Sequence, residues 1–171
     1  MSELDWDSPI ATGNDDALRA AVLRVFSAVL AEEIEPDTDG DVPIWVDDVL
    51  TYAVVDSRAG VVELTTYLVE RIAGRTRAAE VLVDLQAQWP DARLELHQDR
   101  VTAVQRVPAR PLVPVHLARA VAVVAALVPH VPELAARLGG RACVFDEPGD
   151  ETAGEVVDLL GGCGCDGCGC R

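Results

Sequence analysis

The sequence predicts an α+β domain in which helices pack against an antiparallel five-stranded sheet. Two observations support this class. Three long stretches repeat apolar residues at intervals of three and four, which is the pattern of helices that bury one face. Five shorter runs are rich in Val, Thr and Tyr, and the short connections between them favour antiparallel pairing. The resulting order of elements is α-β-β-β-α-β-β-α.

The first helix should begin near Asn14, because Asn14, Asp15 and Asp16 are good N-cap residues and the two Asp side chains suit the positive end of a helix. It should end before Pro36, since the residue that precedes a proline avoids helical geometry. The buried face of this helix is predicted to consist of Leu18, Val22, Val25, Phe26, Val29 and Leu30.

Three strands are expected next, at residues 43–46, 50–55 and 61–69. The third run is apolar on both faces, which indicates a central strand rather than an edge. A second helix is expected at residues 76–89, where Pro90 stops it.

The second half of the domain should open with a hairpin of strands 93–97 and 101–107. A proline-rich linker leads to the third helix, which begins after Pro114 and is ended or kinked at Pro129. A shorter helical piece, residues 132–138, stops at two glycines, and a last amphipathic segment covers about residues 152–160.

Charge is distributed unevenly along the 171 residues. All 14 basic residues are Arg, and the 29 acidic residues concentrate at 1–16, 32–48 and 145–171, which gives a net charge of −15. Binding phosphates needs the opposite sign, so we expect no nucleic-acid partner. The longest apolar run, residues 120–128, is too short to span a bilayer, and the acidic N-terminus lacks a signal-peptide pattern. We therefore expect a cytoplasmic protein without a membrane partner.

Two motifs beside the third helix resemble the actinobacterial YbjN-like family, whose fold is shared with type III secretion chaperones. They are Pro111-Leu-Val-Pro-Val-His-Leu-Ala-Arg-Ala120 and Pro132-Glu-Leu-Ala-Ala-Arg-Leu-Gly-Gly-Arg141. In that family such stretches open and close the long third helix, and the resemblance covers about residues 15–145 of this chain. It implies a secretion-chaperone-like fold and a non-enzymatic, chaperone-like adaptor that binds a polypeptide client, often as a homodimer.

One departure from the family limits what the resemblance implies. Relatives often carry an Asn-X-X-Asn pair early in the second helix, whereas residues 81–89 of this chain contain no Asn. Details of peptide contact that rest on those Asn residues do not carry over, so the resemblance assigns no peptide-binding residue here.

The last residues of the chain contain the motif that the family does not explain. Its four thiols lie within eight residues separated mostly by Gly, a spacing that allows them to surround one soft metal ion. The thiols belong to Cys163, Cys165, Cys168 and Cys170. The alternative function is therefore metal handling, with zinc or copper bound by this tail. A reduced tail, disulfides and dithiol redox chemistry remain open, and the domain itself is expected to need no cofactor.

The other reactive side chains favour structural roles. Cys143 lies in an apolar setting and is expected to be buried. His97, His116 and His130 are far apart, so an enzyme that uses His116 or His130 is a third hypothesis without a recognised motif. The acidic loop at 37–41 resembles a calcium loop but lacks the glutamate at its twelfth position, which favours a turn.

These inferences divide the chain into four parts. Residues 1–13 should form a disordered acidic arm and residues 14–145 the YbjN-like domain. Residues 146–160 should form a short helix, and residues 161–171 a flexible tail rich in Cys and Gly.

Overall fold

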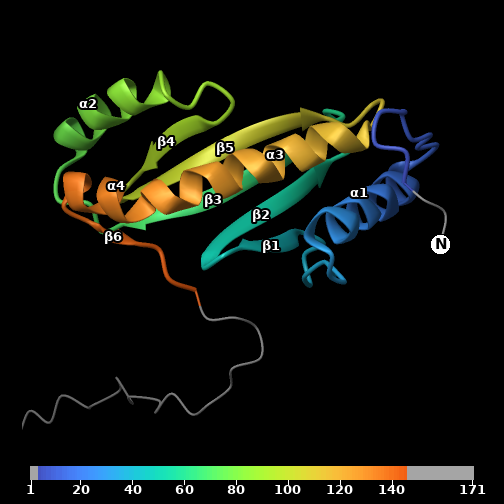
Figure 1. Ribbon diagram of the computed structural model, residues 1–171, viewed down its shortest axis with the longest axis horizontal. Coiled ribbons are helices and arrows are strands. Elements are labelled where there is room, and N and C mark those ends of the chain that lie inside the picture. The colour runs from blue at the N-terminus through green and yellow to red at the C-terminus, as the bar shows by residue number, and fades with distance from the viewer. Residues whose placement is uncertain (1–3, 146–171) are drawn as a thin grey trace, which may run out of the picture.

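The computed structural model describes residues 4–145 (Figure 1). The last two predicted parts of the chain, and with them the four tail cysteines, lie outside these residues. The elements in chain order are α1 (Asp15–Leu30), β1 (Val42–Val46), β2 (Val49–Asp56), β3 (Val61–Glu70), α2 (Arg75–Gln86), β4 (Arg93–His97), β5 (Arg100–Pro108), α3 (Pro114–Leu127), a 3₁₀ turn (Val128–His130), α4 (Val131–Leu138) and β6 (Arg141–Ala142). The predicted order of helices and strands is confirmed.

The five predicted strands form one antiparallel sheet in the order β1-β2-β3-β5-β4. β3 is central, as its apolar faces predicted. β6, a two-residue strand that pairs with the end of β3 at Val69 and Glu70, was not predicted. Gly140 permits this approach, because a Cβ there would stand 2.6 Å from the carbonyl oxygen of Glu70.

The four α-helices pack against the same face of the sheet, and Figure 1 shows α3 running across it. One buried cluster joins α1 and the start of α3 to β1, β2 and β3, with Phe26 and Leu117 fully buried at its centre. A second cluster joins α2 and α4 to the ends of β3 and β5 through Leu68, Leu82 and Leu134. The opposite face of the sheet has no helix over it within the described residues.

The predicted start of α1 is correct, and its end comes earlier than the proline signal indicated. The Asn14 side chain accepts a hydrogen bond from the Ala17 N–H at 2.8 Å, which caps the helix. Ala31 adopts a left-handed conformation with φ of 58°, and the Ser27 hydroxyl accepts a bond from the Ile34 N–H at 3.2 Å. These local bonds turn the chain before Pro36 is reached.

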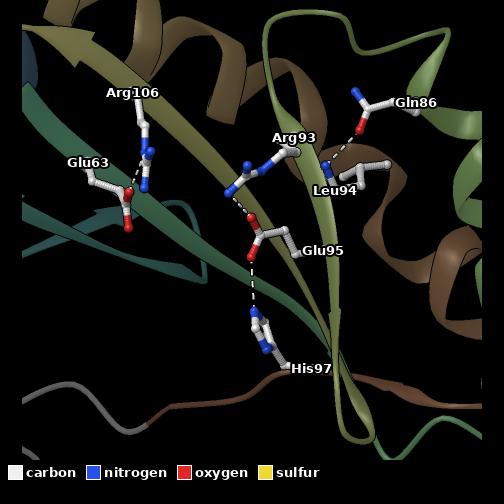
Figure 2. Close-up of polar contacts among 7 residues, drawn as sticks. All are labelled: Glu63, Gln86, Arg93, Leu94, Glu95, His97 and Arg106. Carbon is white, nitrogen blue, oxygen red and sulfur yellow. Dashed lines mark hydrogen bonds and ion pairs between the residues drawn. The ribbon is translucent and has the colours of Figure 1, made fainter.

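Helix α2 is also shorter than predicted, because a side chain at its end redirects the backbone. The Gln86 amide donates to the carbonyl oxygens of Trp89 at 2.9 Å and Ala92 at 2.8 Å, and its own oxygen accepts from the Leu94 N–H at 2.8 Å. Figure 2 shows the last of these bonds. Gln86 therefore fixes the loop that connects α2 to β4.

The stretch Pro114–Leu138 is long and apolar enough to cross a membrane by length and composition. In the fold only part of this stretch is buried, and the buried part belongs to the core. Leu117, Val124 and Leu134 are buried against the sheet or neighbouring helices. Pro129 breaks the helix with a 3₁₀ turn, as the sequence predicted.

The N-terminal arm differs from its prediction over the residues that the structure describes. Ile10 pairs with Leu112, its N–H donating to the Leu112 carbonyl at 2.8 Å, and the Trp6 carbonyl accepts from the Val115 N–H at 2.9 Å. Residues 4–13 therefore lie against the domain rather than forming a disordered arm. Leu4 and Ile10 supply the apolar contact that the acidic composition concealed.

Candidate functional site

The sheet has a free edge where β5 extends past β4. β4 begins at Arg93, which stands opposite Val104, while β5 continues to Pro108. Ala109 donates its N–H to the Gly60 carbonyl at 2.9 Å, on the side of β3. Backbone groups of an antiparallel strand alternate in direction, so Arg106 directs its N–H and C=O away from β3. No described strand stands opposite Arg106 on that side.

A groove of about 700 Å³ lies along this free edge. Its walls are residues 105–108 of β5, residues 88–91 of the α2–β4 loop, and the face of α3 between His116 and Ala126. We call it the α3–β5 groove. Its volume falls within the range of protein sites that bury a ligand.

The α3 wall of the groove changes character along its length. His116 and Arg119 are exposed in the first half of the helix, and Ala122 and Ala126 are exposed in the second half. The spacing of three and four residues places all four on one side of the helix. Trp89, half-buried in the α2–β4 loop, also lines the groove. The groove therefore combines a basic half with an apolar half.

The other edges of the sheet are less open to a further strand. The Leu94 N–H of β4, which points outward, already donates to the Gln86 side chain. β1 carries Pro43, which has no N–H to donate and is typical of edge strands. Among the described strands, the segment of β5 beyond Val104 thus offers an edge with a groove beside it.

The sheet face opposite the helices carries ion pairs, one between two strands and two within β4, shown in Figure 2. The Arg106 Nε donates to Glu63 at 2.7 Å. Glu95 pairs with Arg93 and with His97, whose Nε2 lies 2.9 Å from it. The hydrogen bond from His97 is the largest effect on the pKa of Glu95 and lowers it from 4.5; burial opposes this, and the charge of Arg93 lowers the pKa further. This face is internally neutralised.

The predicted candidate residues do not assemble into one centre. His97 ends β4, His116 lies in the first turn of α3, and His130 stacks edge-on against Trp89 with ring centroids 5.4 Å apart. His116 shares the groove with Asp91, but no hydrogen bond joins them in residues 4–145. Within that same part, no group of three or more His, Cys, Asp or Glu side chains is placed to hold a metal.

Two smaller predictions have clear outcomes. Cys143 is buried, and desolvation raises the pKa of its thiol to about 11, so it is a core residue as predicted. The acidic loop is a turn in which the Asp37 carboxylate accepts from the N–H groups of Asp39 at 3.0 Å and Asp41 at 2.9 Å.

The sequence interpretation missed the residues of the α3–β5 groove apart from His116. A signal was present in the predicted hairpin, whose second strand is longer than its first and whose extra residues lead into Pro108. Unequal arms leave part of one strand unpaired. The exposed alanines of α3 gave no such signal, because only the packed structure shows which of them face the groove.

Comparison with known proteins points to one family. Residues 16–146 match the family model described as "T3SS (YopN, CesT) and YbjN peptide-binding chaperone 1". No curated protein sequence matches the chain.

Solved structures with a similar fold include three complexes. The structure of the HopA1-SchA chaperone-effector complex matches with a TM-score of 0.56 and 17% identity, over 70% of this chain and 98% of that chain. The ExsC-ExsE complex matches with a TM-score of 0.53 and 18% identity, over 71% of this chain and 96% of that chain. The Yersinia pestis type III secretion chaperone SycH, in complex with a stable fragment of YscM2, matches with a TM-score of 0.51 and 16% identity, over 68% of this chain and 98% of that chain.

Proposed function

This chain belongs to the family of T3SS (YopN, CesT) and YbjN peptide-binding chaperones, and we propose that it holds an extended segment of its client in the α3–β5 groove. The family is one of peptide-binding chaperones rather than enzymes, which agrees with the sequence prediction of an adaptor. The proposal rests chiefly on the free edge at Arg106, because that edge and the groove lie side by side.

The proposed mode of binding is strand addition. A client backbone that lies beside β5 would exchange hydrogen bonds with the N–H and C=O of Arg106 and donate to the C=O of Pro108. Alternate side chains of the client would point toward Ala122, Ala126 and Trp89, which supply an apolar surface. The backbone bonds depend little on client sequence, which suits a chaperone.

Selection from a random nine-residue peptide library displayed on phage, with the full chain as bait, tests this proposal. Selected peptides should bind the wild-type chain in solution, measured by fluorescence anisotropy. Ala126→Glu places a charge in the apolar half and should weaken binding at least tenfold. Ala125→Glu is the matched control, because Ala125 is exposed on the same helix and does not line the groove.

A second pair of variants separates the backbone of β5 from its side chain. Arg106→Pro removes the outward N–H at an edge position where proline is tolerated, and should abolish binding. Arg106→Ala keeps the N–H and should retain most of the peptide binding. Equal binding by Ala126→Glu and Ala125→Glu, or by the two Arg106 variants, would remove the groove from the mechanism.

The proposal also covers assembly and location. We infer that the chain forms a homodimer in the cytoplasm. The uncovered sheet face supports dimer formation, since it exposes Val54, and its Glu63 and Arg106 are paired with each other and so do not repel a second copy. Light scattering during gel filtration should give twice the chain mass, and a monomer at micromolar concentration would contradict this part.

A further inference from the structure

We propose that the α3–β5 groove selects client segments in which an acidic residue precedes a small or branched apolar residue by about three positions. This inference rests on the proposed function, because it assigns sequence preference to the same groove.

The first observation is the free positive charge at one end of the groove. Arg119 is exposed, lines the groove and makes no ion pair with any described residue. His116 lies one turn before it, close to the helix N-terminus, where the helix dipole is positive. A protein with a net charge of −15 thus has a locally basic surface at this position, and a client carboxylate is its complement.

The second observation is that the opposite end of the groove favours apolar groups. Ala122 and Ala126 are small and exposed there, and Trp89 lines the same groove. Asp91 of the α2–β4 loop is the carboxylate among the described lining residues. An apolar side chain of the client would lie against the alanines at that end, while Asp91 disfavours additional acidic residues on the client.

The distance between these two ends sets the spacing. Arg119 and Ala126 are seven residues apart on α3, which is about 10 Å at 1.5 Å per residue. An extended peptide covers that length in about three residues. A client with its acid and apolar residue three positions apart can therefore reach both ends at once.

The direction of the sheet sets the order. Every strand pair in the described sheet is antiparallel. The client would lie beside β5 on the same side as β4, which runs antiparallel to β5. A client that also runs antiparallel to β5 has its N-terminal end beside Pro108 and the start of α3, and its C-terminal end toward Arg93. Its acidic residue therefore comes first and its apolar residue second.

The peptide selection, repeated with charge variants, tests the inference. Wild-type bait should enrich Asp or Glu three positions before Val, Ile, Leu or Ala. Arg119→Glu should replace that preference by Lys or Arg. Arg24→Glu changes the net charge equally at an exposed helix position outside the groove, and should select the same peptides as wild type.

The affinity of one enriched peptide measures how much its acidic residue contributes to binding. Changing its Asp to Asn should weaken binding to the wild-type chain about two- to fivefold, as expected of an exposed ion pair. The same change should have no effect on Arg119→Gln. A peptide of reversed sequence should bind more weakly than the original.

The outcomes separate the inference from the function beneath it. Failure to enrich any peptide that depends on Ala126 would contradict the proposed function itself. Enrichment that is lost in Ala126→Glu but shows no acidic preference, or a preference unchanged by Arg119→Glu, would overturn the inference alone.

Discussion

Gln86 should contribute more to stability than its partly exposed position on α2 indicates. Its side chain makes three hydrogen bonds to backbone groups of the α2–β4 connection, at 2.8–2.9 Å. Replacing it with Ala removes all three and leaves the backbone groups of Trp89, Ala92 and Leu94 without that partner. The same substitution frees the outer edge of β4.

The size of the effect follows from the number of bonds and their burial. A net contribution of about 1 kcal/mol for each bond gives about 3 kcal/mol for a fully buried site. Gln86 is half-buried, so water will replace some of the lost hydrogen bonds. We therefore expect Gln86→Ala to lower the free energy of unfolding by about 2 kcal/mol. The melting temperature should fall by about 4–8 °C in a domain of this size.

Urea denaturation of the full chain measures the loss directly. Gln88→Ala is the matched control, because Gln88 is exposed nearby and its side chain makes no hydrogen bond among the described residues. It should change the free energy of unfolding by less than about 0.5 kcal/mol. If Gln86→Ala is no less stable than Gln88→Ala, the three bonds do not hold the connection.

Four further predictions concern other parts of the chain. Gly140→Ala should cost about 1–3 kcal/mol in urea unfolding, because its Cβ would stand 2.6 Å from the Glu70 carbonyl oxygen; wild-type stability would contradict this packing. Glu70 has its pKa lowered from 4.5, first by the hydrogen bond from Arg141, so the stability it contributes is present above pH 4.5 and is lost as pH falls through the lower folded-state pKa. Glu70→Gln should therefore reduce the loss of stability in acid, and an unchanged pH profile would refute the role of this pair. At pH 8 the Cys143 thiol, whose burial raises its pKa to about 11, should react with iodoacetamide about a thousandfold more slowly than a thiolate would, until urea exposes it; rapid labelling of the peptide that contains Cys143, measured by mass spectrometry on the folded chain, would contradict its burial. Native mass spectrometry under reducing conditions should find one zinc or copper(I) ion bound by the cysteines of residues 163–170, lost when all four become Ser, and a metal-free chain at micromolar metal would exclude the site.

Features set by neighbouring residues were predictable from the sequence. Asn14 caps α1 because its side chain reaches an N–H only three residues away, and Pro129 breaks the helix through its own ring. The five strands of the main sheet were found within about two residues of their predicted ends. In each case the deciding interaction is short-range.

Features set by distant residues were not predictable. Trp89 continues the apolar spacing of α2, yet the helix ends at Gln86, because hydrogen bonds to the loop and to Leu94 outweigh one more helical turn. The groove depends on the orientation of α3, since Ala125 and Ala126 are both exposed and only Ala126 lines it. The sequence pattern alone does not distinguish these two alanines.

Amide hydrogen exchange at Arg106 is the most direct measurement of the central claim, that a client segment adds to the free edge of β5. It requires the full chain with and without a selected peptide at saturating concentration. The account predicts that the Arg106 amide exchanges more slowly when the peptide is bound, while the Trp45 amide on the β1 edge is unaffected. Unchanged exchange at Arg106 together with protection at Trp45 would contradict it.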